Sequence, residues 1–173
     1  SRSHGDKKQV AMMNDVVERA ITLARTTLAD PSGLRFNQVT ITRAFEENLP
    51  PVPCFVAEMQ QVFLSLFRHC VHALAKVKRS DFEPEIRVEI IECYDALWIK
   101  VQHNGQGLTG DEQHNLFEPF VNTWPNKKPE TMEAENRLSF THFIITDHHQ
   151  GQLAITSDVN VGTTFHIQLQ LNH

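Results

Sequence analysis

Hydrophobic positions in the first half of the chain follow two helical patterns. Apolar side chains recur at intervals of three and four residues from about residue 14 to 28, and more strongly over residues 55–78. Asn14 or Asp15 can cap the first helix, because a short polar side chain there accepts a hydrogen bond from the first turn. Residues 38–45 alternate apolar and polar side chains. The first half therefore predicts a helix, a strand and a long helix.

The second half changes to the period of two that is typical of strands. Runs over residues 86–93 and 96–102, joined by a tight turn at Tyr94-Asp95, predict a hairpin. A long irregular segment follows, from residue 109 to about 137. The other expected elements are a rigid proline-rich linker at 49–53, a short helix near 111–117, a helix over 138–148 ending at Gly151, strands over 153–157 and 163–171, and a turn at 159–162.

The order of these elements is helix, strand, long helix, hairpin, long loop, helix and hairpin. Hairpins favour antiparallel pairing, and the helices must cover one face of the sheet. We therefore expect a two-layer α/β sandwich with a mixed, mostly antiparallel sheet. A loop of about 25 residues is unusual inside a compact domain unless it forms a lid over a ligand.

Composition narrows the class of protein. Hydrophobic residues make up 40% of the 173-residue chain and charged residues 21%, which excludes a disordered chain. The formal charge of −5 argues against a nucleic-acid partner, because such binding needs a basic face. No apolar run approaches the ~18 residues of a membrane span and no signal peptide is visible, so we expect a cytoplasmic protein without direct membrane contact. Three cysteines without a C-x-x-C pair favour reduced thiols.

Four motifs in order resemble one known family. Residues 58–73 resemble the N box of sensor histidine kinases, and His-Asn-Gly-Gln-Gly at 103–107 stands where their Asp-x-Gly-x-Gly motif stands. Residues 116–123 are close to their F box, and residues 161–167 resemble their last strand pair. Over about residues 15–171 the chain is similar to the ATP-binding domain that histidine kinases share with gyrases, one class of heat-shock chaperones and MutL-type proteins. This is the HATPase_c or GHKL family, whose architecture is the Bergerat fold.

The resemblance also implies a domain organisation. Residues 1–13 are expected to be a tag remnant or the tail of a preceding segment. Residues 14–173 are expected to form one histidine-kinase-like ATP-binding domain, with the lid at about residues 106–137.

Three substitutions affect the nucleotide chemistry that the resemblance implies. His103 replaces the Asp that accepts from the adenine amino group, and a neutral imidazole can accept there in only one tautomer. His69 replaces the Mg²⁺-binding Asn, with Ser65 one turn earlier, and imidazole is a poor ligand for a hard cation. Residues 133–139 have no glycine and carry two carboxylates where a phosphate-binding motif is expected.

The resemblance therefore implies a degenerate histidine-kinase-type ATPase domain that keeps the architecture and has lost the ATP chemistry. We expect no enzyme activity, no catalytic residue, no cofactor and no metal. The alternatives are an active kinase or ATPase that binds ATP and Mg²⁺ through non-standard residues, and a pocket repurposed for another ligand. The vestigial nucleotide pocket would comprise Ser65, His69, His72, His103, Gly105, Gly107, Phe117 and Thr163.

Such a domain would act in two-component signalling through protein–protein contacts. The expected partners are signalling proteins, such as a histidine kinase dimerisation domain or a response regulator.

Other side chains carry alternatives. His69 and His72 lie three residues apart on one helical face and, with His103, could bind a transition metal, although lining of a vestigial cleft is the simpler interpretation. His148 and His149 are expected to be solvated at a helix C-terminus, where the helix dipole favours positive charge. Cys70 is expected in the core. The lid aromatics Phe117, Phe120 and Trp124 either close over the cleft or anchor a partner, and we expect closure.

Overall fold

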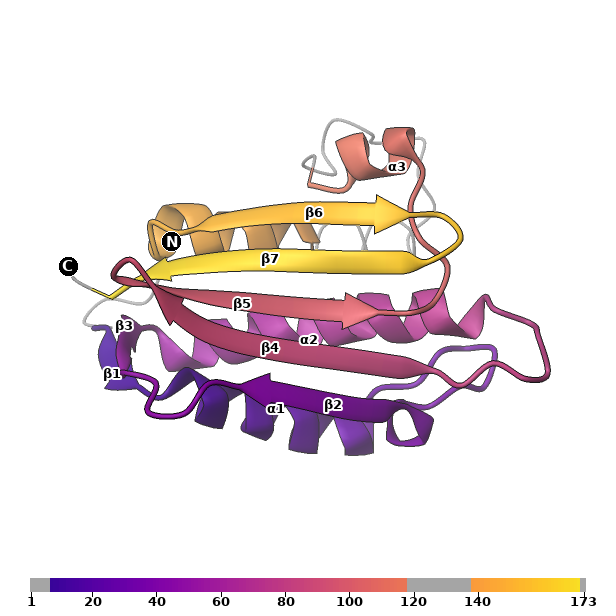
Figure 1. Ribbon diagram of the computed structural model, residues 1–173, viewed down its shortest axis with the longest axis horizontal. Coiled ribbons are helices and arrows are strands. Elements are labelled where there is room, and N and C mark those ends of the chain that lie inside the picture. The colour runs from indigo at the N-terminus through magenta and orange to yellow at the C-terminus, as the bar shows by residue number, and fades with distance from the viewer. Residues whose placement is uncertain (1–6, 118–137, 172–173) are drawn as a thin grey trace.

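Five strands form one sheet in the order β2-β4-β5-β7-β6 in the computed structural model, which describes residues 7–117 and 138–171 (Figure 1). The helices α1 and α2 and the helical residues 138–148 cover one face of this sheet, as Figure 1 shows. The predicted two-layer α/β sandwich is confirmed. The strands are β2 (Thr40–Phe45), β4 (Glu85–Cys93), β5 (Ala96–His103), β6 (Gln152–Asp158) and β7 (Gly162–Gln170).

The sheet is mixed, as predicted. β4–β5, β5–β7 and β6–β7 are antiparallel, and only the edge pair β2–β4 among these is parallel. The β4–β5 turn lies at Tyr94 and Asp95, which have φ of 53° and 58°. Two successive positive φ values are typical of the type I′ turn, whose twist matches that of the flanking strands. The predicted hairpin is therefore confirmed together with its turn.

The core lies between the sheet and the two long helices. α1 (Met13–Thr27) and α2 (Val56–Ala75) bury one face each, and the inward side chains of β4 and β5 alternate with exposed ones. This is the burial that the period-two pattern predicts for a sheet covered on one side. The largest fully buried side chains include Phe63, Phe67, Phe165, Met59 and Leu97. Cys70 is buried among them, as expected.

Two short strands lie where the sequence indicated a tail and a linker. β1 (Gln9–Ala11) pairs antiparallel with β3 (Val52–Cys54), so the extended linker predicted at 49–53 belongs to a strand over its last two residues, a pairing that was not predicted. Pro53 has no N–H to donate and is tolerated because this ribbon has only two strands. The N-terminal ribbon leads directly into α1, whose N-cap is Met12 without a side-chain cap rather than Asn14 or Asp15.

Three short helical elements complete the fold. η1 (Phe36–Gln38) precedes β2, and α3 (Gly110–Asn115) is the expected short helix after β5. Residues 138–143 are α-helical and run into η3 (Ile144–His148), a π-helical turn that ends the predicted helix before Gly151. Gly151 is required there, since a Cβ would lie 2.3 Å from the carbonyl oxygen of Gln168. Within residues 7–117 and 138–171, none of the helices has the length and apolar character needed to span a bilayer.

Candidate functional site

The structure brings three of the predicted pocket residues together between α2 and the centre of the sheet. His103 ends β5 and pairs in register with Thr163 at the start of β7. His69 projects from α2, with its ring centroid 6.1 Å from that of His103 and 5.3 Å from that of Phe165. Thr163 is buried, and its hydroxyl lies 2.7 Å from the Ser157 hydroxyl. Residues from one helix and two strands therefore form one side-chain cluster.

The two glycines after β5 hold the chain against its neighbours. Gly105 lies on the end of α2, where a Cβ would come within 2.8 Å of the Ala73 and Leu74 backbone. Gly107 lies against the β6–β7 turn, where a Cβ would come within 2.0 Å of the Asp158 carbonyl oxygen. Neither position has room for a side chain. Gly105 and Gly107 therefore have a structural role that is independent of any ligand.

The protonation state of His103 follows from its contacts. Its Nδ1 lies 2.9 Å from the backbone nitrogen of Gly105, and an N–H can only donate, so Nδ1 must accept. A neutral imidazole has one proton, which must therefore lie on Nε2. The ring is 1% exposed, and burial lowers the pKa of His103 to about 4, so it is neutral at pH 7. His103 thus presents a buried N–H donor, and Nε2 has no hydrogen-bond partner within the described part of the chain.

His69 is the second neutral imidazole of the cluster. Burial lowers the pKa of His69 to about 3, and the neighbouring His103, His72 and Lys76 act in the same direction. Part of the residue stays exposed, but Nε2 is buried and lacks a hydrogen-bond partner in the described residues. The cluster thus contains two buried imidazole nitrogens without hydrogen-bond partners among the described residues, which is unfavourable unless a polar group meets them.

His72 does not share this environment, although it lies on the same helix. Its side chain is 63% exposed, and Nδ1 lies 2.8 Å from the carboxylate of Asp30 in the loop after α1. Burial raises the pKa of Asp30, but hydrogen bonds from Ser32 and His72 outweigh it, and the net shift is downward. His72 therefore joins α2 to the loop that follows α1 and does not face His103.

Ser65, one turn before His69 on α2, lines a pocket of about 190 Å³. The pocket lies between α2, the end of α1 and the helical residues 138–144, and its polar side chains include Gln61, Arg68 and Thr141. His69 and His103 do not line it. The predicted pocket residues are therefore divided between a buried cluster and a separate surface pocket.

The structure describes the lid only in part. Phe117 is half-buried and stacks on the ring of His142 at a centroid distance of 5.0 Å. Phe120, Trp124 and the glycine-free residues 133–137 lie outside the described residues. Closure of the lid aromatics over the cleft therefore stays a prediction.

The geometry opposes a transition metal on His69, His72 and His103. A metal at Nε2 of His103 would have to displace the proton that Gly105 forces onto this atom. His72 points to Asp30 instead. Among residues 7–117 and 138–171, no group of three histidine, cysteine or carboxylate side chains could hold a metal ion.

Of two histidines that we expected in solvent, His149 is buried and His148 is half-buried. His149 is 3% exposed and His148 has a 12% exposed side chain that pairs with Glu58 of α2. Their partners are remote in sequence, so the helix-terminus pattern alone did not indicate burial. The residues that cover the two rings, Phe55 and Glu58, lie about 90 positions earlier in the chain, so no local sequence signal was available.

These features define a class of two-layer α/β domain. It has a mixed five-stranded sheet, helices on one face, and a side-chain cluster between the long helix and the central strands. Over residues 56–173 the chain matches the family model described as histidine kinase-, DNA gyrase B-, and HSP90-like ATPase. The chain belongs to this family.

Known relatives agree with this assignment. The chain is 25% identical to sporulation kinase E of Bacillus subtilis over 124 residues, covering 71% of this chain and 15% of the kinase. It is 23% identical to the signal transduction histidine-protein kinase AtoS of Escherichia coli, covering 99% of this chain and 25% of AtoS. The catalytic domain of histidine kinase ThkA has the same fold, with a TM-score of 0.73, 16% identity, and coverage of 96% and 97% of the two chains. The chain spans less than a third of the length of the curated relatives it matches.

Proposed function

We propose that the chain is a degenerate ATPase domain of the histidine kinase type, with weak or absent ATP binding, that acts in two-component signalling through protein contacts. The observation that most strongly supports this proposal is the tautomer of His103. An adenine amino group donates hydrogen bonds, and the site residue that the resemblance assigns to it should accept them. Gly105 occupies the only acceptor atom of the neutral ring, which leaves a donor on Nε2.

Two donors that face each other lose a hydrogen bond and leave both groups unsatisfied. Replacing a charged acceptor by a neutral group costs roughly 1.5–3 kcal/mol, which is about tenfold or more in affinity. His69 adds a second loss, because a buried imidazole does not replace the oxygen ligand that Mg²⁺ prefers. The sequence at residues 133–139 adds a third, since it has no glycine and two carboxylates.

The partners would be the proteins of a two-component system, such as a histidine kinase dimerisation domain or a response regulator. A cytoplasmic location fits this role. The family membership and the kinase names of the relatives support a role in two-component signalling in general, without identifying a particular partner.

The decisive measurement is nucleotide binding in the presence of Mg²⁺. We expect no heat of binding and no change in melting temperature with sub-millimolar Mg·ATP. An increase of about 5 °C or more would contradict the proposal and favour an active ATPase with non-standard residues.

The double variant His103→Asp, His69→Asn restores two contacts, and we expect at most weak binding because residues 133–139 remain unsuited to phosphate. Tight binding by this variant would show that those residues do not matter.

The orphaned donor on His103 also favours a second candidate, a pocket that takes a ligand with a hydrogen-bond acceptor. A purine with a carbonyl at position 6 offers this group, and adenine does not. The same binding assay with inosine and guanosine triphosphates tests this candidate directly. Binding of these nucleotides in preference to ATP, abolished by His103→Asp, would support repurposing. If none of these nucleotides bound, the second candidate would be rejected and only the non-catalytic role would stand.

A further inference from the structure

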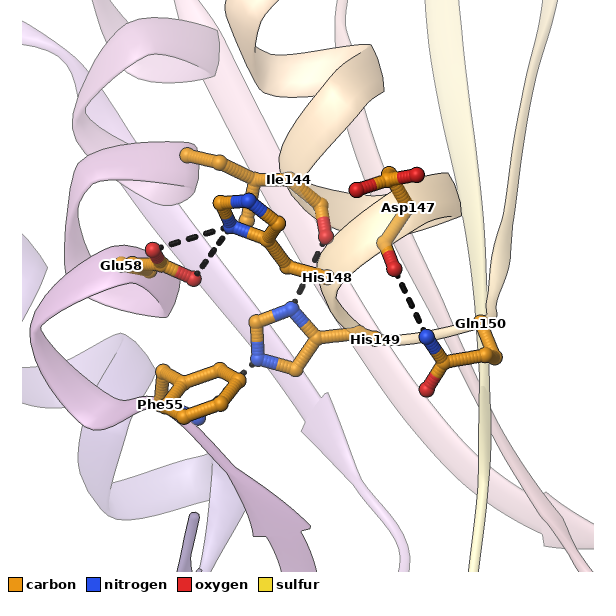
Figure 2. Close-up of polar contacts among 7 residues, drawn as sticks. All are labelled: Phe55, Glu58, Ile144, Asp147, His148, His149 and Gln150. Atoms are coloured by element: carbon orange, nitrogen blue, oxygen red, sulfur yellow. Dashed lines mark hydrogen bonds and ion pairs between the residues drawn. The ribbon is translucent and has the colours of Figure 1, made fainter. Parts of the chain in front are cut away.

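His149 lies where the end of η3 meets the beginning of α2 (Figure 2). The ring is buried, with Nε2 3.0 Å from the backbone nitrogen of Phe55 and Nδ1 2.9 Å from the carbonyl oxygen of Ile144. The Phe55 ring packs against it edge-on at a centroid distance of 5.3 Å. One imidazole thus connects two helices whose contacting residues are 94 positions apart in the sequence.

These two hydrogen bonds require a single protonation state. The Phe55 N–H can only donate, so Nε2 must accept. The Ile144 carbonyl can only accept, so Nδ1 must carry the proton. Both contacts therefore need the neutral ring with its proton on Nδ1. A second proton on Nε2 would place two donors face to face across 3.0 Å.

The contact with Phe55 does the work of a helix cap. Phe55 is the N-cap of α2 and its own side chain makes no capping bond. In a capping box, the side chain of the third helical residue accepts from the N-cap N–H. That residue is Glu58, but its carboxylate lies 3.0 and 3.1 Å from Nδ1 of His148. His149 supplies the acceptor that Glu58 does not, as Figure 2 shows.

Groups on several neighbouring elements act on the pKa of this ring. Burial lowers the pKa of His149, and Lys8 and His148 act in the same direction, whereas the Ile144 carbonyl and Glu58 raise it. Lys8, in the segment before β1, lies 5.7 Å above the Phe55 ring and 3.2 Å from the Gln150 side chain. The positive end of the α2 dipole also opposes a charge on His149. Cys54 of β3 is buried, and burial raises the pKa of its thiol, so it stays neutral.

The neighbouring contact is of a different kind, because it joins His148 to a carboxylate. A positive charge on His148 strengthens its pairing with the Glu58 carboxylate. The corner therefore contains one hydrogen bond that a proton breaks and, one residue away, a histidine–carboxylate contact that accepts a charged ring.

We propose that His149 forms a pH-sensitive link between η3 and α2. Its two hydrogen bonds form when the ring is neutral, and the bond to Phe55 breaks when the ring is protonated. Opening removes the cap of α2 and the anchor of the helical residues 138–148, while His148 and Glu58 keep the two elements near each other. Phe140, Thr141 and Ile144 of this helix line the surface pocket together with α2. Acid would thus change the pocket wall through one side chain. This inference does not depend on the proposed loss of ATP binding.

The test is the exchange of the Phe55 amide hydrogen, followed by NMR together with the imidazole ¹⁵N shifts of His149, from about pH 7.5 to about pH 5. At the upper pH the ¹⁵N shifts should report a neutral ring with its proton on Nδ1. Protection of Phe55, corrected for the intrinsic pH dependence of exchange, should fall about tenfold or more with the midpoint of His149.

Three variants isolate the cause. His149→Gln places an amide oxygen near the position of Nε2 and should keep Phe55 protected at every pH. His149→Asn keeps only the Nδ1-like position and should leave Phe55 unprotected throughout. Glu58→Gln retains His149 but removes a charge that favours protonation, so the midpoint should move to lower pH. His166→Gln, on the sheet and hydrogen-bonded to Thr156, is the matched control and should not change the profile.

Two results would overturn the proposal. One is protection of Phe55 that stays constant while His149 titrates. The other is a pH transition at Phe55 that persists in His149→Gln. If His149→Gln did not fold, the first of these results would decide alone, because it needs only the parent protein.

Discussion

His69 and His103 occupy positions where only the uncharged ring can be accommodated. Burial is the first cause in both cases, lowering the pKa of His69 to about 3 and that of His103 to about 4. In the unfolded chain both rings return to an ordinary pKa near 6.5. The folded and unfolded states therefore bind different numbers of protons over several pH units.

This difference predicts acid sensitivity with a definite sign. Between about pH 6.5 and 4 the unfolded chain binds more protons than the folded one, so the free energy of unfolding must fall as pH falls. For His103 alone, the loss between about pH 7 and pH 5 is about 2 kcal/mol. Urea unfolding at the two pH values measures it.

His103→Asn isolates this contribution, because the Asn oxygen can still accept from the Gly105 N–H and cannot be protonated. The variant should lose about 2 kcal/mol less than the parent between the two pH values. His114→Gln on the exposed surface of α3 is the control. An equal loss in the parent and in His103→Asn would contradict the burial of this ring.

The ten histidines are visible in the sequence, but their protonation is not. His103 differs from His114 only through the backbone and side chains that surround it, and these come from other parts of the chain. The same holds for His149, whose partner Phe55 lies 94 residues away. The sequence was enough to predict which residue types lie at the site. The tautomer of each histidine could be assigned only from the folded structure, because it depends on hydrogen-bond partners that are remote in sequence.

At the scale of elements, the loop after β5 depends on two glycines that contact backbone. We expect Gly107→Ala and Gly105→Ala each to destabilise the domain by about 1–3 kcal/mol or more, because the neighbouring atoms are carbonyl and amide groups that cannot rotate away. Gly110→Ala is the matched control, since nothing lies within 4 Å of its Cβ. That variant should be neutral or stabilise by about 0.4–1 kcal/mol. Chemical denaturation of the three variants compares them, and a harmless Gly107→Ala would refute the close approach.

Long periodic elements were predicted with good bounds, and short paired ones were not. α2 has nine buried side chains on one face, and the β4–β5 hairpin has its turn at two residues. β1 and β3 have three residues each, one of them proline, and their pairing joins segments about 40 residues apart. No local pattern specifies such a pair. The π-helical turn of η3 was also missed, because its side-chain spacing resembles that of an α-helix over a single turn.

For the molecule as a whole, the reactivity of the three cysteine thiols measures how well the folded protein excludes solvent from its interior. Cys54 and Cys70 are buried, and burial raises the pKa of both thiols, whereas Cys93 is half-buried at the end of β4. We expect one thiol to react quickly with a disulfide reagent in the folded protein and the other two only on unfolding. Cys93→Ser should abolish the fast phase. Rapid modification of two thiols in the native state would show that the layers open locally.

The strand order has a consequence for the time course of folding. The β4–β5 and β6–β7 hairpins close short loops, whereas β5 and β7 join residues at least about 60 positions apart. Local pairs form in microseconds, and non-local pairs must first bear the entropy of closing a long loop. His103 and Thr163 face each other across the non-local pair. The two hairpins are therefore expected to precede the cluster at the centre of the sheet, whose residues meet only when β5 and β7 dock.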